Sequence, residues 1–229
     1  MNYTTILADL DNTLFDFNAG EKKSLPLVFE KFGFEFNNEI QQAYIKENTR
    51  LWHSYENGET DMNGVLDNRF RLTMKHFGKD IDGHEWDMYY RSLLCECCEL
   101  MPGAHSFCKT LKEAGLRVFV VTNGVEKTQI SRLTRSGMLG YFDGVFTSQK
   151  IGARKPDCAF FDYVAKHIDG FRPTETLMIG DSPATDVRGG HDFGLDTCLV
   201  TWGNPSVDKS LATFVAKNLA EAERICLSE

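Results

Sequence analysis

The hydrophobic pattern divides the chain into two kinds of segment. Short apolar runs bounded by polar residues are typical of buried strands, whereas apolar residues at spacings of three and four predict helices. Strands are expected at residues 3–9 and in "LRVFVVT", "GVFTS", "TLMIGD" and "DTCLVT". Helices are expected near 104–114, 126–136, 157–168 and 184–192, and a last short strand and helix within 212–227.

A different pattern fills residues 17–100. Apolar positions recur there at helical spacing and no strand is expected. Four amphipathic helices are predicted in "EKKSLPLVFEKFGF", "NNEIQQAYIKENTRLWHSY", "NGVLDNRFRLTMKHFG" and "HEWDMYYRSLLCECCEL". In the rest of the chain strands alternate with helices, which predicts an α/β fold with a parallel sheet covered on both faces. We therefore expect a core domain of residues 1–16 and 101–229, with a helical domain of residues 17–100 inserted into it.

Composition restricts the classes of partner. With 229 residues and a formal net charge of −8, the chain is unsuited to binding nucleic-acid polymers, which favour basic surfaces. A small phosphorylated substrate is still compatible, because a metal ion can supply positive charge locally. No run of about 18 apolar residues predicts a membrane span, and the first residues do not resemble a signal peptide. The seven cysteines show no metal-ligand spacing. We expect a cytoplasmic protein, monomeric or weakly dimeric.

Polar residues follow the predicted strands where each strand ends. Asp9 and Asp11 follow the first strand, Thr122 and Asn123 the second, and Asp181 follows "MIG", with Asp186 five positions later. Lys155 lies in "ARKPD" just before a predicted helix. Ligands bind at the carboxyl ends of strands in an open parallel sheet. The sequence therefore predicts one site at this edge.

Each signal has an ordinary structural explanation when taken alone. Acidic residues often end strands, "TNG" is typical of a turn, and "GDS" is suited to capping a helix. A lysine before a proline is most often solvated. Four such signals in order at successive strand ends favour a shared chemical role.

That role follows from the residue types. Carboxylates crowded at one edge are tolerable if they hold a divalent cation, and oxygen ligands suit Mg²⁺. A phosphoryl group held beside a carboxylate can undergo in-line attack and form an aspartyl-phosphate. A second carboxylic group can protonate the leaving oxygen and then activate water. A threonine hydroxyl and a lysine can neutralise charge on the phosphoryl oxygens.

The motifs "DLDNTL", "VVTNG", "RKP" and "IGDSPATD" resemble the four motifs of the haloacid dehalogenase (HAD) superfamily, in the same order. The resemblance implies a Rossmann-like core with an inserted C1-type helical cap. It assigns Asp9 as nucleophile and Asp11 as general acid/base, and it matches Thr122 and Lys155 to phosphate binding and catalysis. Mg²⁺ would be held by the carboxylates of Asp9 and Asp181 and by the main-chain carbonyl of Asp11. Asp186 would lie beside these ligands without binding the metal directly.

Several reactions remain open within the superfamily. Dehalogenation is disfavoured because this chain has both the second aspartate and the metal-binding aspartate. The segments 51–78, 150–168 and 194–204 resemble the pyrimidine-type 5'-nucleotidases, which implies hydrolysis of nucleoside 5'-monophosphates. Phosphoglycolate or sugar-phosphate phosphatase is the alternative, with phosphomutase ranked below it. A non-catalytic binding module is disfavoured because no catalytic aspartate is missing.

The leaving group would have to be recognised outside the four motifs. Phe15 and Phe17 follow the catalytic loop and could stack on a base, and Phe17 is the substrate-binding candidate, with Thr122 and Asn123. Aromatic residues of the helical segment, such as Trp86 and Tyr90, are more simply explained as core. The sequence does not identify the physiological substrate.

Overall fold

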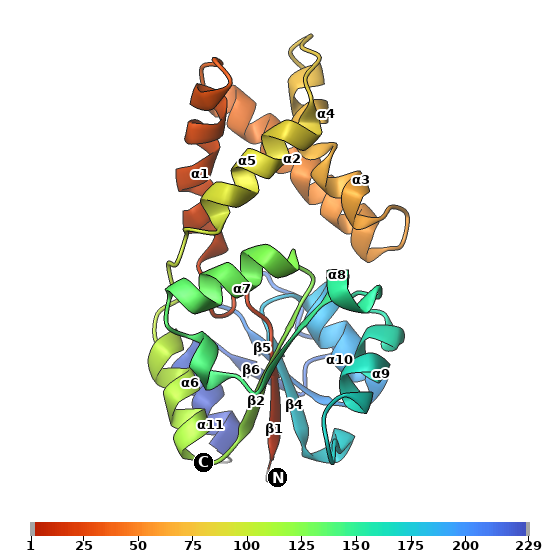
Figure 1. Cartoon of the computed structure of the whole chain (residues 1–229). Helices are drawn as coiled ribbons and strands as arrows, with labels where there is room; N and C mark the ends of the chain where they lie inside the picture. Colours follow the sequence, from red (N-terminus) through yellow and green to blue (C-terminus); the bar gives the residue numbers. More distant parts are fainter. Residues whose placement is uncertain (1–2, 228–229) are drawn as a thin grey trace. The chain divides into compact units, whose positions relative to one another are not determined.

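The computed structural model describes residues 3–227 and confirms the expected α/β class. Its strands form one parallel six-stranded sheet in the order β3-β2-β1-β4-β5-β6. Figure 1 shows β1 between β2 and β4. Their bounds are β1 Thr5–Ala8, β2 Arg117–Thr122, β3 Gly144–Thr147, β4 Thr176–Gly180, β5 Asp196–Val200 and β6 Phe214–Ala216. The strand order reverses at β1, which has β2 on one side and β4 on the other. This central strand carries the first predicted motif.

The described contacts divide the chain into two compact units. The sheet unit comprises residues 1–17 and 98–229, and the helical unit residues 18–97. The sequence pattern predicts the two domain boundaries between residues 16 and 17 and between residues 100 and 101. None of the described helices has both the length and the apolar character to cross a membrane.

Alternate residues of β1, β2 and β4 pack into two separate cores, as expected for a sheet covered on both faces. On one face, Ile6 and Ala8 of β1 belong to a core that includes residues of α6 and α11. On the other face, Leu7 packs in a core with residues of α9. The helices of this unit are α6 Ala104–Glu113, α7 Glu126–Arg135, α8 Ser148–Ile151, α9 Cys158–Lys166, α10 Arg188–Phe193 and α11 Leu219–Leu227. Shorter turns are η1 Leu139–Tyr141, η2 Pro173–Glu175 and the π-helix η3 Pro183–Val187.

The helical unit has an aromatic core of its own. Trp86 stacks on Phe32 with ring centres 4.6 Å apart, and Tyr90 lies edge-on to Phe70 at 5.4 Å. Trp86 and Tyr90 are buried. The chain runs through this unit as α1 Phe17–Lys31, which begins one residue before it, and then as α2 Asn38–Glu56, α3 Met62–Leu66, α4 Arg69–Lys75 and α5 Gly83–Leu94.

Two helix predictions in this unit were wrong. The single helix expected over residues 63–78 is broken between α3 and α4, where Asn68 donates a side-chain hydrogen bond to the Gly64 carbonyl at 2.8 Å. Gly83 approaches the Asp67 carbonyl so closely that a Cβ there would lie 2.1 Å from it. The fourth helix ends at Leu94, so the cysteines of "CECC" follow a helix and do not lie on it.

The sheet unit also departs from the pattern in two places. The helix expected near 184–192 is a π-helix, η3, followed by α10. The short helix α8 was not expected, and Thr147 caps it by accepting a hydrogen bond from the Lys150 amide at 3.3 Å. With four residues, α8 is too short for periodicity to identify it as a helix.

Candidate active site

Two parallel neighbours bring the predicted motifs together around the end of β1. Asp9 directly follows the strand, and its amide donates to the Ile179 carbonyl of β4 at 2.9 Å. The chain then turns at Asn12, which has a φ of 60°. The Trp202 indole donates to the Asn12 carbonyl at 2.8 Å and holds this turn. Asp9 therefore lies between the ends of β2 and β4, as the parallel order requires.

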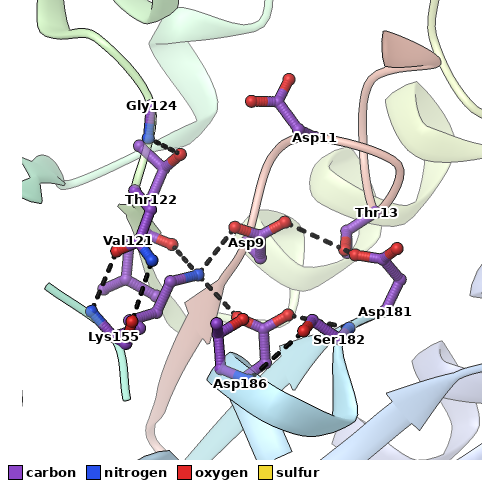
Figure 2. A network of polar contacts seen from close by, with 12 residues as sticks. Asp9, Asp11, Thr13, Val121, Thr122, Gly124, Lys155, Asp181, Ser182 and Asp186 are labelled. Carbon is purple, nitrogen blue, oxygen red and sulfur yellow. Dashed lines mark hydrogen bonds and ion pairs between the residues drawn. The ribbon is translucent and has the colours of Figure 1, made fainter. Parts of the chain in front are cut away.

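Lys155 is the central cation of the site (Figure 2). Its ammonium donates to Asp9 Oδ1 at 2.7 Å, to Asp186 Oδ1 at 2.6 Å and to the Val121 carbonyl at 2.8 Å. The side chain is 2% exposed. Asn123 fixes the Lys155 backbone, because its amide group donates to the Lys155 carbonyl and accepts from the Lys155 amide, both at 2.9 Å.

Asp181 lies on the far side of Asp9 from Lys155, whereas Asp186 contacts the lysine (Figure 2). The Thr13 hydroxyl lies 3.2 Å from Asp9 Oδ2 and 3.2 Å from Asp181 Oδ1 (Figure 2). Asp186 Oδ2 accepts from the Ser182 amide at 3.1 Å. One carboxylate oxygen from each of Asp9, Asp181 and Asp186 lies within 4.8 Å of the other two. Three predicted acidic residues are therefore brought together.

Burial and mutual repulsion disturb the ionisation of this cluster. Burial raises the pKa of Asp9 well above its usual range, despite the Lys155 ammonium, and Asp186 and Asp181 add to the rise. Burial, followed by the charge of Asp186, raises the pKa of Asp181 to about 7. Burial alone would lower the pKa of Lys155, but the carboxylates of Asp186 and Asp9 outweigh it and raise that pKa. One buried ammonium faces three carboxylates, so negative charge is in excess.

This donor set fits a hard divalent cation. Carboxylate oxygens are the ligands that Mg²⁺ prefers, and a cation would offset the excess negative charge. Both oxygens of Asp186 already accept hydrogen bonds, from Lys155 and from the Ser182 amide. Both oxygens of Asp9 are in contact too, with Lys155 and Thr13, but the Asp9 side chain is 10% exposed against 1% for Asp186. Asp9 and the half-buried Asp181 are therefore more accessible to a metal ion than Asp186.

The carboxylate of Asp11 does not join this cluster. It points away from the carboxylate of Asp9 (Figure 2). It forms an ion pair with Arg132, and its Oδ2 accepts from the Gln129 amide group at 2.6 Å. Asp9 and Asp11, two positions apart, therefore face different cations.

The predicted phosphate-binding hydroxyl is held in place within the second motif. Thr122 is buried, and its Oγ1 accepts from the Gly124 amide at 3.0 Å and from the Gln129 amide group at 3.1 Å. Both donors come from the turn and helix that follow β2.

The aromatic candidates separate into core and site. Phe15 is fully buried in the core of the sheet unit, so the idea that its ring stacks on a base was wrong. Phe17 is half-buried, and its ring centre lies 5.9 Å from the Arg132 guanidinium carbon. Trp86 and Tyr90 are core residues, as the simpler explanation held.

Three residues of this region were missed by the sequence reasoning. Gln129 and Arg132 lie three positions apart on α7, directly after the second motif, and Trp202 follows β5. The available sequence signal for the first two was a pair of polar residues spaced three apart on the predicted helix after the second motif. Trp202 gave no signal of its own.

Comparison with known proteins identifies relatives along most of the chain. The family model described as haloacid dehalogenase-like hydrolase matches residues 3–194. The HAD-hydrolase YfnB of Bacillus subtilis is 35% identical over 97% of this chain and 95% of its own length. A crystal structure of YfnB bound to magnesium has a TM-score of 0.93 to this structure, with 34% identity and coverage of 99% of both chains.

Three further relatives are named after their substrates. The pyrimidine 5'-nucleotidase PynA of Streptococcus pneumoniae is 34% identical over 90% of this chain and 85% of its own length. The pyrimidine 5'-nucleotidase YjjG of Escherichia coli is 27% identical, with 98% of both chains covered. A ribulose-1,5-bisphosphate 5-phosphatase of Halopiger xanaduensis is 28% identical over 86% of this chain and 84% of its own length, so relatives differ in substrate.

Proposed function

Because the chain belongs to the haloacid dehalogenase-like hydrolase family, we propose that it is a Mg²⁺-dependent phosphate monoester hydrolase. The observation that carries the proposal is the position of Asp9, held between the Lys155 ammonium and the Thr13–Asp181 pair. The buried Lys155 and the acidic cluster match what phosphoryl transfer to a carboxylate needs, which is positioning and charge neutralisation. All four motifs are present, which disfavours the alternative of a non-catalytic binding module.

In the proposed reaction the Asp9 carboxylate attacks phosphorus and the bond from phosphorus to the leaving oxygen breaks. Asp11 gives its proton to that oxygen, and the leaving group departs as an alcohol. Asp11 then takes a proton from water, which attacks the aspartyl-phosphate and releases inorganic phosphate with Asp9 restored. The Lys155 ammonium offsets the negative charge on the phosphoryl oxygens, and the Thr122 hydroxyl stabilises that charge as a hydrogen-bond donor.

The carboxylates of Asp9 and Asp181, with the Asp11 main-chain carbonyl, would hold Mg²⁺, which supplies charge neutralisation when bound. The magnesium-bound YfnB structure supports this choice of ion. Asp186 would hold Lys155, since its Oδ1 lies 2.6 Å from the ammonium. Asn123 would act through the Lys155 backbone, to which it makes two hydrogen bonds.

For the substrate we propose nucleoside 5'-monophosphates, pyrimidine ones first. The names of PynA and YjjG support this, and the half-buried ring of Phe17 offers a surface on which a base could stack. Phosphoglycolate or sugar phosphates are the alternative substrates. The motif residues would contact only the phosphoryl group, so they do not select among leaving groups. A mutase uses the same residues and ranks below both.

The reaction class is tested with a generic aryl phosphate. We expect turnover with Mg²⁺ or Mn²⁺, loss of turnover in excess chelator, and weak or no activation by Ca²⁺, whose looser coordination suits in-line geometry less. Asp9→Asn is the matched control and should be inactive, because an amide is not a nucleophile here. Full activity in chelator, or an active Asp9→Asn variant, would overturn the proposal.

The substrate class is tested separately, with a panel of phosphate monoesters. We expect kcat/KM for UMP and CMP to exceed that for phosphoglycolate and hexose phosphates. Phe17→Ala should reduce this preference while sparing the aryl phosphate, since stacking acts on the base. Sugar phosphates leading the panel, with nucleotides inert, would overturn the nucleotide assignment and leave the phosphatase assignment standing.

A cytoplasmic location is also part of the proposal. All seven cysteines are described and none forms a disulfide. Reduced thiols are the rule in compartments kept reducing by glutathione and thioredoxin.

A further inference from the structure

The second aspartate of the first motif is held by two residues of α7 that belong to none of the four motifs. Arg132 Nη1 forms an ion pair with Asp11 Oδ1, and the Gln129 amide nitrogen donates to Asp11 Oδ2 at 2.6 Å. The two holders contact each other, because Arg132 Nη1 donates to Gln129 Oε1 at 3.0 Å. Both oxygens of the carboxylate are therefore fixed by one rigid pair.

The pair is itself built into the sheet unit. The side chain of Arg132 is 3% exposed, against 29% for Asp11. The Arg132 guanidinium carbon lies 4.5 Å from the centre of the buried Phe15 ring and 5.9 Å from that of Phe17. Gln129 is also buried. A buried cation packed against an aromatic ring is restricted in its rotamers, so it holds a partner more accurately than a solvated arginine does.

Gln129 also joins Asp11 to the phosphate-binding motif. Its amide nitrogen donates to Thr122 Oγ1 at 3.1 Å as well as to Asp11 at 2.6 Å. Gly124 leaves room for this bridge, since a Cβ there would lie 2.1 Å from the Gln129 amide nitrogen. One side-chain nitrogen therefore separates the Asp11 carboxylate from the Thr122 hydroxyl.

We propose that Gln129 and Arg132 are positioning residues, which fix the Asp11 carboxylate at a set place beside the phosphate-binding hydroxyl. The proposal rests on the proposed function, in which Asp11 transfers a proton to or from an oxygen bound to phosphorus. Proton transfer needs donor and acceptor within hydrogen-bond reach, and a misplacement of about 1 Å can cost about a hundredfold in rate. The pair acts through Asp11 and does not itself touch the substrate.

A purely structural role for the buried arginine is the competing explanation. It predicts lower stability on substitution, with activity lost only as far as folded protein is lost. A positioning role predicts a lower kcat in folded protein, with KM nearly unchanged, because phosphate binding is left to other residues. The two explanations therefore differ in the split between kcat and KM.

The first experiment measures kcat and KM for a nucleotide and for p-nitrophenyl phosphate in four variants of the whole chain. We expect kcat to fall about thirtyfold or more in Arg132→Met and Gln129→Met, with KM within about threefold of wild type. Arg132→Lys should retain part of the kcat that Arg132→Met loses, since lysine keeps the positive charge but lacks the planar set of guanidinium N–H donors. Arg135→Met is the matched control, an exposed arginine on the same helix, and should retain kcat.

A second experiment separates positioning from folding. Single-turnover release of p-nitrophenolate is measured in Asp11→Asn, with and without Arg132→Met. A good leaving group needs little acid catalysis, so Asp11→Asn should still transfer the phosphoryl group to Asp9. If Arg132 acts through Asp11, adding Arg132→Met should change this rate less than about twofold, because the effects of residues acting as a unit do not add. A further large loss in the double variant would overturn the proposal.

Gly124→Ala offers an independent test, because it should displace Gln129 while leaving both α7 side chains chemically intact. We expect it to lower kcat in the same way as Gln129→Met. Wild-type kcat in folded Arg132→Met or Gln129→Met would also overturn the positioning role. Absence of phosphate hydrolysis in the wild-type protein would instead overturn the proposed function, so the two failures are distinguishable.

Discussion

The Lys155 ammonium lies 2.7 Å from Oδ1 of Asp9, a residue 146 positions away in the chain. Both side chains are buried. The fold therefore assembles a buried ion pair at the end of its central strand and shares it with a second carboxylate, Asp186, at 2.6 Å from the same nitrogen.

Replacing Lys155 by methionine should affect both activity and stability. Two buried carboxylates would lose their counter-ion, which destabilises proteins by about 3–5 kcal/mol. The proposed donor to the phosphoryl group would also be lost, for about a hundredfold in kcat. Urea unfolding and steady-state kinetics measure the two effects. Arg154→Met is the control, because Arg154 is adjacent in sequence and forms an ion pair with Asp157 at 3.8 Å. Equal effects of the two substitutions would contradict the assignment of Lys155.

The two aspartates of the first motif should differ in their effect on metal binding. Asp9→Asn replaces a proposed metal ligand and should weaken Mg²⁺ binding measured by calorimetry. Asp11→Asn should leave that affinity nearly unchanged, because its proposed ligand is the main-chain carbonyl, yet it should remove most of the turnover. Loss of Mg²⁺ binding in Asp11→Asn, or near-wild-type activity in it, would show that the roles are wrongly assigned.

Gly180→Ala should displace Asp186 and so disturb the candidate active site. A Cβ at Gly180, the last residue of β4, would lie 2.0 Å from Asp186 Oδ2. Asp186 would have to move, and its contact with Lys155 would move with it. We expect kcat to fall about tenfold or more and the free energy of unfolding to fall by about 1–3 kcal/mol. Gly140→Ala is the control, since a Cβ there meets nothing within 4 Å.

Glu21 provides a pH test in the helical unit. Burial raises the pKa of Glu21, more than the charge of Arg69 lowers it, although the Tyr90 hydroxyl donates to it at 3.1 Å. A carboxyl whose pKa is higher in the folded state binds more protons there than in the unfolded chain. Its contribution to stability therefore becomes less favourable as the pH rises from its unfolded-state pKa through its folded-state pKa.

Glu21→Gln removes this titration. The stability of the variant relative to wild type should therefore increase from pH 4 to pH 8, as measured by urea unfolding at a series of pH values. Glu30→Gln, which changes an exposed glutamate of the same helix, is the control measured over the same pH series. A relative stability of Glu21→Gln that falls with pH would contradict the raised pKa.

The hydrophobic pattern determined the sheet and the edge at which chemistry gathers. Apolar strands alternating with helices require a parallel sheet, and parallel strands end on the same edge, so Asp9, Thr122 and Asp181 had to come near one another. The family motifs then gave these residues their expected roles. These conclusions do not depend on tertiary contacts, because the ends of the strands and the order of the elements along the chain are visible in the sequence.

Other features depended on contacts across the chain. The pattern predicted one helix where α3 and α4 are separate, and beside that break Gly83 lies against the Asp67 carbonyl, a contact between segments that the pattern does not reveal. Periodicity indicates which face a residue occupies and gives no information on the partner that meets it there.

The pairing of charges was likewise decided by tertiary structure. The sequence placed Asp9 and Asp11 together, but the fold gives Asp9 to Lys155 and Asp11 to Arg132, 121 positions away. The reason is geometric. The chain turns at Asn12 directly after these residues, and α7 reaches the same edge only once β1 and β2 have paired in parallel. A sequence records both residue types, whereas their meeting depends on strand order and on side-chain direction.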